Sequence, residues 1–318
     1  MFTFQTQARH GYSVQFSPFY AQRLACATSQ HYGIAGSGRL FVLDFTPGHG
    51  IQPIRVLDWN SGLFDVTWSE DNENVLVTGS GDGSLQVWDA MQPAAPLKVL
   101  KDHTREVYSV HWSQTRNEHF IISASWDRTI KLWDIHKENP LSTCTGHDGL
   151  VYSAVWSPHI PGCVASVSGD QTLRVWDLRN PEAARMIIPA HSAEILTCDW
   201  AKYDQNVLFT GSVDAVIRGW DIRRGDRCLC ELTGHHMAVR RLKTSPHVGS
   251  VLASTSYDFT VRIWDTSSKQ CTDNLEHHSE FVYGLDFNLH TSGQLADCGW
   301  DELVRVYSVP SCLPKEPP

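Results

Sequence analysis

The segment EVYSVHWSQTRNEHFIISASWDRTIKLWD, residues 106–134, contains three short runs in which apolar and polar side chains alternate. The runs are VYSVHWS, FIISAS and TIKLWD, and polar turn residues separate them. Alternation with a period of two is typical of β-strands. The segment therefore predicts strand, turn, strand, turn, strand, ending in the dipeptide Trp133-Asp134.

The Trp-Asp dipeptide recurs along the chain at nearly constant spacing. Five copies have tryptophans 45, 43, 44 and 44 residues apart: Trp88-Asp89, Trp133-Asp134, Trp176-Asp177, Trp220-Asp221 and Trp264-Asp265. Two degenerate copies extend the series, since Leu43-Asp44 lies 45 residues before Trp88 and Tyr307-Ser308 lies 43 residues after Trp264. A fixed period of this length indicates a repeat architecture, here with seven units.

A second series lies in phase with the dipeptides, inside the first alternating run of each unit: Phe16, Trp68, Trp112, Trp156, Trp200, Thr244 and Phe287. These signatures at a period near 44 are those of the WD40 repeat. Seven copies predict an all-β, seven-bladed propeller with four-stranded blades around a central channel. We expect residues 1–318 to form one domain, with repeat units at about 9–45, 58–90, 102–135, 146–178, 190–222, 234–266 and 277–308, a closing strand at 1–8 and a tail at 309–318.

The two ends of the chain predict how the ring closes. The last unit stops at Tyr307, and the following SVPSCLPKEPP contains four prolines, which rule out a regular fourth strand there. The amino-terminal FTFQTQ, residues 2–7, alternates. We expect it to pair as the outer strand of the last blade, which removes an exposed sheet edge.

Composition excludes several classes of function. Asp and Glu number 35 against 26 Lys and Arg, a formal net charge of −9, so a nucleic-acid partner is not expected. The nine cysteines include no Cys-x-x-Cys pair, and we expect reduced thiols, no metal and no cofactor. Without a run of about 18 apolar residues or a secretory signal, the chain is expected to be soluble and intracellular, with no direct membrane insertion.

A set of histidine, serine or threonine, aspartate and tryptophan recurs in the middle units. It resembles a hydrolase triad, but an active site needs one such set, with an exposed nucleophile. We interpret the four copies as buried structural networks and expect no enzyme activity. They are His103, Ser123, Asp127 and Trp133; His147, Ser166, Asp170 and Trp176; His191, Thr210, Asp214 and Trp220; and His235, Ser254, Asp258 and Trp264.

The first two units depart from this pattern. Unit 1 has Ser37 where the aspartate belongs, and unit 2 has Trp59 where the histidine belongs. We therefore expect the stretch from Asp44 to Asn60 to be an irregular loop.

One end of the channel is predicted to be acidic and aromatic. Residues just before and at the start of the inner strands emerge at this end, as do residues just before the aspartate in the turn that precedes the last strand of each unit. Four of them carry carboxylates, which would favour a cationic ligand: Asp65, Glu106, Glu194 and Glu280. The alternatives are solvated rim charges and aromatic packing between blades. Arg240 and Arg241 either pair with these acids or meet an acidic partner. The candidate ligand-binding residues are Asp65, Glu106, Tyr108, Trp126, Tyr152, Glu194, Tyr257 and Trp300.

Several segments resemble one family in particular, the peroxisomal receptors for the type 2 targeting signal. The least generic are DWNSGLFDVTWSE at 58–70, WSPHIPGC at 156–163 and EHHSEFVYGLDF at 276–287. Others are RLACATSQHYGIAGSGRL at 23–40, GSGDGSLQVWD at 79–89, EVYSVHWSQTR at 106–116, AEILTCDW at 193–200 and SYDFTVRIWD at 256–265.

The resemblance implies a non-enzymatic receptor for an amino-terminal nonapeptide with a basic first residue. It further implies a co-receptor, the long form of the receptor for carboxy-terminal signals or a fungal equivalent, indirect contact with docking proteins, and cycling between cytosol and peroxisome. A helical signal would present its basic first residue, the histidine at its position eight and its aliphatic residues on one face, because positions one and eight are about two turns apart. We expect its cation at Asp65 or Glu106 and its leucine at Trp126, Tyr108 or Tyr257. Asp65→Lys and Glu106→Lys are both expected to leave the fold intact.

A second interpretation comes from two four-residue motifs. Residues 176–179 and 220–223 match the Trp-Asp-x-Arg pattern of substrate receptors of cullin-type ubiquitin ligases. The pattern is weak, since arginine two residues after the dipeptide is common in WD40 strands. Co-purification with a ligase adaptor would favour this alternative.

Overall fold

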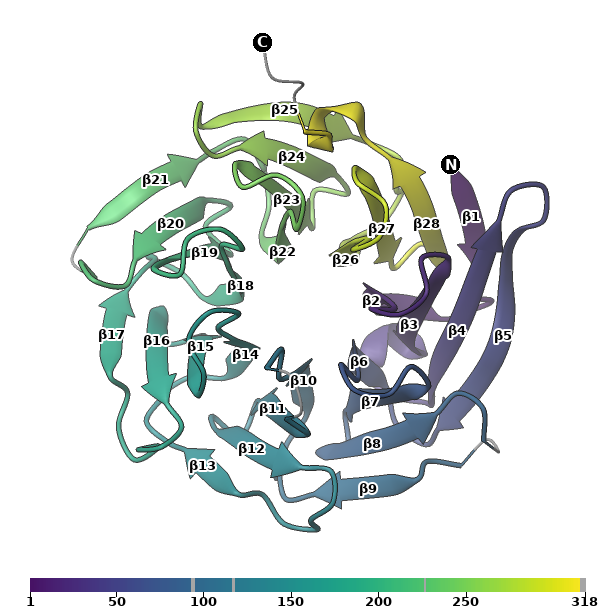
Figure 1. The fold of residues 1–318 in the computed structure, drawn as a ribbon, viewed down its shortest axis with the longest axis horizontal. Helices are drawn as coiled ribbons and strands as arrows, with labels where there is room; N and C mark the ends of the chain where they lie inside the picture. The colour runs from purple at the N-terminus through teal and green to yellow at the C-terminus, as the bar shows by residue number, and fades with distance from the viewer. Residues whose placement is uncertain (93–94, 116–117, 226, 315–318) are drawn as a thin grey trace.

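Seven four-stranded antiparallel sheets stand around a central opening in the computed structural model of the chain (Figure 1). The structure describes residues 1–92, 95–115, 118–225 and 227–314; the last four residues of the predicted tail lie outside this range. In six sheets the four strands follow the chain from the centre outward, and the seventh takes its outer strand from the amino terminus. The predicted seven-bladed propeller is confirmed.

The blades, each from inner to outer strand, have the following bounds. Blade 1 is β2 (His10–Phe16), β3 (Arg23–Ser29), β4 (Gly38–Thr46) and β5 (Gly50–Trp59); blade 2 is β6 (Leu63–Trp68), β7 (Val75–Ser80), β8 (Ser84–Asp89) and β9 (Lys98–Lys101). Blade 3 is β10 (Val107–Trp112), β11 (Phe120–Ser125), β12 (Ile130–Asp134) and β13 (Ser142–Cys144); blade 4 is β14 (Val151–Trp156), β15 (Cys163–Ser168), β16 (Thr172–Asp177) and β17 (Met186–Pro189). Blade 5 is β18 (Ile195–Trp200), β19 (Val207–Ser212), β20 (Ile217–Asp221) and β21 (Cys228–Leu232); blade 6 is β22 (Val239–Thr244), β23 (Val251–Ser256), β24 (Val261–Asp265) and β25 (Gln270–Leu275). Blade 7 is β26 (Val282–Phe287), β27 (Gln294–Gly299), β28 (Leu303–Ser308) and β1 (Phe2–Gln5), and two 3₁₀ turns lie at η1 (His31–Gly33) and η2 (Pro310–Cys312). Among the described residues, no helix has the length and apolar character needed to cross a membrane.

The expected loop from Asp44 to Asn60 is wrong. The chain there completes β4, turns, and forms β5, the longest strand among the described residues at 10 residues. Its register runs from Gly38 opposite Trp59 to Thr46 opposite Gly50. The missing motif residues alter side-chain bonding at the end of the blade but leave the backbone pairing of this hairpin intact.

The tryptophans of both series fill the spaces between neighbouring blades. Trp68 from the inner strand β6 and Trp88 from the Trp-Asp dipeptide are both buried, in one cluster with Ala25 and Val42 of blade 1. Each blade therefore buries its apolar faces against its neighbours, and the core of the molecule is distributed around the ring.

Strand β1 closes the ring as predicted. It pairs antiparallel with β28, Phe2 opposite Val306 and Gln5 opposite Leu303. Its aromatic side chains also pack on blade 1, since the Phe4 ring lies 5.4 Å from that of Phe41. The first residues of the chain thus join the last blade to the first.

A β-bulge lies near the start of every inner strand. In β10 the register shifts between Val107 and Ser109, which leaves Tyr108 without a partner in β11 and turns it toward the channel. The same shift occurs in the other six inner strands. We call the seven bulge residues the plug and this end of the channel the mouth; the plug consists of Tyr12, Phe64, Tyr108, Tyr152, Leu196, Arg240 and Tyr283.

Polar side chains inside the channel join each inner strand to the next. The Asp65 carboxylate accepts a hydrogen bond from the backbone N–H of Val110 at 3.0 Å, and the Thr197 hydroxyl accepts one from Leu242 at 3.1 Å. In both cases donor and acceptor are 45 residues apart, one repeat. These bonds satisfy backbone donors on the free edge of the inner strands, which faces the channel.

Candidate functional site

The repeated polar sets form closed networks inside their blades. His103 contacts the Asp127 carboxylate through Nδ1 and the Ser123 hydroxyl through Nε2, both at 2.7 Å, and the Trp133 indole N–H donates to Ser123 at 2.8 Å. The hydroxyl is fully buried, and burial lowers the pKa of His103. Such a hydroxyl is a hydrogen-bond partner of the core and is not placed to act as a nucleophile.

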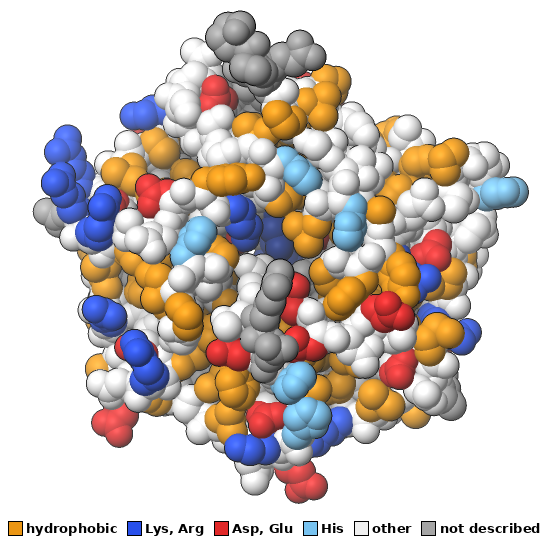
Figure 2. All heavy atoms as spheres, viewed as in Figure 1, with side chains coloured by type: hydrophobic (Ala, Val, Ile, Leu, Met, Phe, Trp, Pro, Cys, Tyr) orange, Lys and Arg blue, Asp and Glu red, His pale blue; other side chains and the backbone are white. Residues whose placement is uncertain are grey.

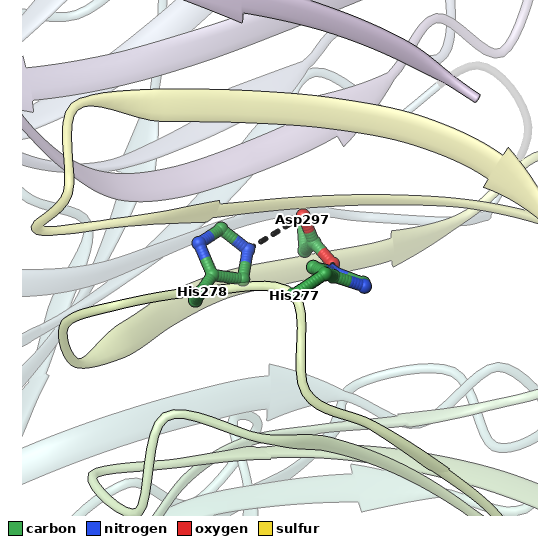
Figure 3. A group of neighbouring side chains, drawn as sticks. All are labelled: His277, His278 and Asp297. Atoms are coloured by element: carbon green, nitrogen blue, oxygen red, sulfur yellow. Dashed lines mark hydrogen bonds and ion pairs between the residues drawn. The ribbon is translucent and has the colours of Figure 1, made fainter.

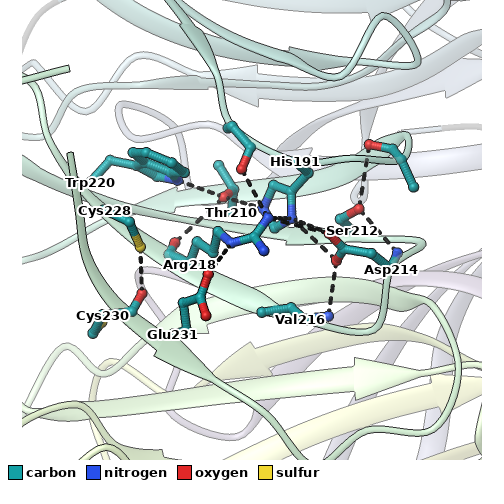
Figure 4. Close-up of polar contacts among 12 residues, drawn as sticks. His191, Thr210, Ser212, Asp214, Val216, Arg218, Trp220, Cys228, Cys230 and Glu231 are labelled. Carbon is teal, nitrogen blue, oxygen red and sulfur yellow. Dashed lines mark hydrogen bonds and ion pairs between the residues drawn. The ribbon is translucent and has the colours of Figure 1, made fainter. Parts of the chain in front are cut away.

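The other three predicted sets have the same geometry. The histidine-to-carboxylate distances are 2.7 Å for His147, 3.0 Å for His191 and 2.8 Å for His235. Figure 4 shows the set of blade 5, in which Arg218 also contacts His191 and Asp214. The structure brings together all sixteen residues, four in each of blades 3 to 6.

Units 1 and 2 replace the missing members with other donors. The Trp59 indole N–H lies 3.1 Å from the Ser80 hydroxyl and 3.2 Å from Asp82. Arg9 donates to the Ser37 carbonyl at 2.8 Å and to its hydroxyl at 3.0 Å. In these two blades, different side chains therefore make the hydrogen bonds at the position that the network occupies in blades 3 to 6.

Blade 7 carries a charged version of the set (Figure 3). Asp297 takes the serine position, and its two carboxylate oxygens contact His278 at 2.9 Å and His277 at 2.7 Å. Burial alone would lower the pKa of His278, but Asp297 and Asp301 raise it to about 9. The potential metal-ligating atoms are bonded directly to one another, an arrangement that fits an ion-paired network.

Three of the four predicted acids lie on the rim of the mouth. Glu194 and Glu280 are exposed, and Glu106 keeps 32% of its side chain exposed, with the Arg105 guanidinium 3.7 Å away. They precede the inner strands of blades 5, 7 and 3, so they are distributed around the opening. Carboxylates placed in this way make the electrostatic potential at the rim more negative.

Asp65 is not on this rim, and its predicted position is wrong. Its side chain is buried in the channel, where the Arg241 guanidinium contacts it at 2.8 Å. Burial by itself would raise the pKa of Asp65, but Arg241 and the bond from Val110 hold it below its ordinary value. Because Asp65 directly follows the bulge residue Phe64, its side chain enters the channel wall, so the expectation that Asp65→Lys leaves the fold intact is also withdrawn.

The predicted aromatic residues are half-buried at the mouth. Trp126 stacks on the plug residue Tyr108 with ring centres 5.0 Å apart, and Trp300 stacks on Tyr283 at 4.9 Å. The Tyr257 and Tyr283 hydroxyls lie 2.9 Å apart. One face of each ring packs on the plug, and the rest of each side chain contributes to the mouth surface.

Tyr152 completes this group. It is a plug residue itself, half-buried, and its ring meets Tyr108 at 6.0 Å in an edge-on arrangement. Burial raises the pKa of Tyr108 to about 12, so its hydroxyl is neutral at physiological pH.

Sequence reasoning missed several apolar residues of the mouth. Tyr32 and Ile34, in the segment between β3 and β4, are 52% and 87% exposed, and Met237 and Phe259 of blade 6 are also exposed. A cavity of about 290 Å³ lies beside Glu106, lined by Tyr12, Tyr32, Ile34, Phe64, Tyr108 and Trp126. The long insertion between β3 and β4, in place of a tight turn, was the available signal for this feature.

The remaining surface has a mixed character. Figure 2 shows one face of the disc, on which apolar, acidic and basic side chains are interspersed around the central opening. The arginines of the two Trp-Asp-x-Arg motifs contact their own motif aspartates, Arg179 with Asp177 at 2.7 Å and Arg223 with Asp221 at 2.6 Å.

Comparison with known proteins places the chain in a family. The model described as WD domain, G-beta repeat matches residues 51–89, 94–134, 138–177, 184–221 and 226–265. A Mus musculus protein named peroxisomal targeting signal 2 receptor is 55% identical over 311 residues, which are 98% of this chain and 97% of the mouse protein. The chain belongs to the peroxisomal targeting signal 2 receptor family.

Similarity to this receptor family extends to distant organisms. A peroxisomal targeting signal 2 receptor of Saccharomyces cerevisiae is 31% identical over 228 residues, 63% of this chain and 60% of the yeast protein. Peroxisome biogenesis protein 7 of Arabidopsis thaliana is 45% identical over 127 residues, 39% of this chain and 40% of the plant protein. The resemblance to peroxisomal targeting signal 2 receptors is therefore confirmed.

Proposed function

We propose that this protein is a non-enzymatic import receptor that binds the type 2 targeting signal of peroxisomal matrix proteins at the mouth of the propeller. The observation that carries the proposal is the set of carboxylates, Glu106, Glu194 and Glu280, around an aromatic opening in a member of this receptor family. The buried hydroxyls of the four networks support a role without catalysis.

The chemistry of the mouth suits an amphipathic helix with a basic residue. Rim carboxylates offer charge-assisted hydrogen bonds to the cation. The half-buried rings of Tyr108, Trp126, Tyr257 and Trp300 offer apolar contact to aliphatic side chains on the same helical face. Tyr152 and Glu194 extend this surface toward blades 4 and 5. Asp65 is excluded from direct contact, because it is buried against Arg241.

The proposal includes partners. The co-receptor is the long form of the receptor for carboxy-terminal signals or a fungal equivalent, and contact with docking proteins is indirect. The protein cycles between cytosol and peroxisome. The exposed apolar residues Tyr32, Ile34, Met237 and Phe259 flank the signal site and offer contact area to a co-receptor that closes over the signal.

The test is a fluorescence anisotropy titration of a labelled type 2 signal peptide, with and without the co-receptor. Glu106→Lys should weaken binding by about 1.5 to 3 kcal/mol, the scale of a lost charged hydrogen bond. Glu182→Lys makes the same charge change at an exposed site on the outside of blade 4 and should bind like the parent. Equal affinities for the two variants would remove Glu106 from the site, and lack of binding by the parent in both conditions would contradict the receptor function.

A further inference from the structure

The plug contains one charged residue among its seven members. Arg240 is 2% exposed, and its guanidinium carbon lies 5.0 Å from the ring centre of Tyr108 and 4.7 Å from that of Tyr283. Trp126 and Trp300 stack on the outer faces of these two tyrosines. A stack of five planar groups thus spans the mouth, with the cation at its centre.

This stack covers the faces of the guanidinium but leaves one edge without a partner. Nε and Nη2 of Arg240 are buried and make no hydrogen bond within the described structure. These two nitrogens lie on the same edge of the planar group and present two parallel N–H donors, the fork that matches both oxygens of a carboxylate. The indole N–H groups of Trp126 and Trp300 are buried and unbonded in the same way.

The neighbouring basic residues of the channel are neutralised by contact. Arg241 pairs with Asp65 at 2.8 Å, and Lys243 lies 3.6 Å from Asp286. In the described part of the chain no carboxylate contacts Arg240, and Asp65, which acts on it from further away, is already bonded to Arg241. A buried charge without a counter-ion is costly, so the fork is a strong site for an incoming anion.

We propose that the plug is a carboxylate-binding site, in which the Arg240 fork receives an Asp or Glu side chain of a polypeptide seated on the mouth. This inference goes beyond the proposed function, which assigns only basic and aliphatic side chains of the ligand to the mouth. The rim acids hold the basic groups of a polypeptide and so deliver its carboxylate to the centre, whereas a free carboxylate binds at the same fork more weakly. The ligand is therefore one that carries charges of both signs.

Entry to the fork requires movement of a ring. Tyr108 and Tyr257 are half-buried and face the opening, whereas Tyr12 and Tyr283 are buried beneath them. Rotation of Tyr108, which covers one face of the guanidinium, opens a path from the mouth to the fork, and its phenol hydroxyl is a further donor to the incoming carboxylate.

The experiment is nuclear magnetic resonance of the full chain labelled with ¹⁵N-arginine, with acetate as the probe. The Nε–Hε resonance of Arg240 is identified by its loss in Arg240→Lys. If that variant does not fold, Tyr108→Leu identifies the resonance, because it removes one ring of the stack and shifts the signal. We expect acetate to shift this resonance saturably, and chloride at equal ionic strength to leave it unchanged.

A titration with sulfate tests whether the site prefers a carboxylate. Sulfate is expected to bind at least about tenfold more weakly than acetate, because its tetrahedral oxygens do not match a planar slot between rings. A resonance that acetate does not shift, or that shifts only in proportion to salt, would overturn the proposal. A saturable shift with sulfate and none with acetate would overturn the carboxylate assignment.

Discussion

The Asp65–Arg241 ion pair joins blade 2 to blade 6 across the channel. Both side chains are largely buried, and Asp65 also accepts the backbone N–H of Val110. Removing one partner of a buried ion pair leaves an unpaired charge, which typically costs about 3 to 5 kcal/mol. Asp65→Leu should therefore lower the free energy of unfolding by about this amount in urea titrations. Glu194→Leu on the exposed rim should change it by less than about 0.5 kcal/mol, and equal effects would contradict the burial of this pair.

His278 gives the molecule a pH dependence opposite in sign to that of the histidines in the other four networks, whose pKa values are lowered. Its pKa is raised to about 9 in the folded state, from an ordinary value of 6.5, so the folded protein binds the proton more tightly than the unfolded chain. The resulting stabilisation is fully present below pH 6.5 and is lost as the pH rises through 9. The shift corresponds to about 3 kcal/mol.

Asp297→Ser is the matched control for this prediction, since it restores the serine found at this position in blades 3, 4 and 6, whose histidine pKa is lowered. We expect the unfolding free energy of the parent to fall between pH 6.5 and pH 9 by more than that of the variant. Buried cysteines contribute equally to both proteins, so the difference isolates the histidine. Parallel pH profiles would show that His278 is neutral in the folded state.

At the scale of elements, ring closure depends on four residues at the start of the chain. Phe4 of β1 packs on Phe41 of blade 1, while the backbone of β1 pairs with blade 7. Phe4→Ala should cost about 1 to 3 kcal/mol, less than for a fully buried phenylalanine because the ring is only partly covered. Phe19→Ala, at a residue 39% exposed, is the control and should cost little. Similar melting temperatures for the two variants would contradict the closing role of β1.

Strand positions could be predicted from the sequence because alternation and turn residues are local signals. The β-bulges could not, because an extra residue inside a run such as VYSVHWS leaves the alternation readable while it turns Tyr108 into the channel. For the same reason the sequence predicts Asp65, one residue after a bulge, on the rim, although its side chain is buried in the channel.

At the scale of the whole molecule, the repeat period fixes which residues meet. The spacing of about 44 residues predicted the seven blades and the four polar networks. Contacts across the channel follow the same period, since Asp65 and Arg241 are 176 residues apart, four repeats of 44, and each directly follows a bulge residue. The period does not say which of the equivalent residues pair across the channel. The rim acids were found because their positions follow the repeat, and the apolar insertion at Tyr32 and Ile34 was missed because it does not.

The acidic balance of the chain predicts a salt dependence of signal binding. Added salt screens exposed charges, so the affinity for a basic signal peptide should fall as ionic strength rises. Replacing Glu106, Glu194 and Glu280 together by glutamine should flatten this dependence. A titration series in which parent and triple variant lose affinity equally with salt would show that the rim does not hold the cation.

Locating the bound signal on the propeller tests most directly whether it binds at the mouth. A type 2 signal peptide carrying a photo-crosslinker can be bound to the full chain, irradiated and mapped by mass spectrometry. We expect crosslinks to the mouth, at segments containing Glu106, Trp126, Tyr257 and Trp300. Crosslinks confined to the opposite end of the channel, at the loops with Tyr203 and Leu289, would contradict binding at the mouth.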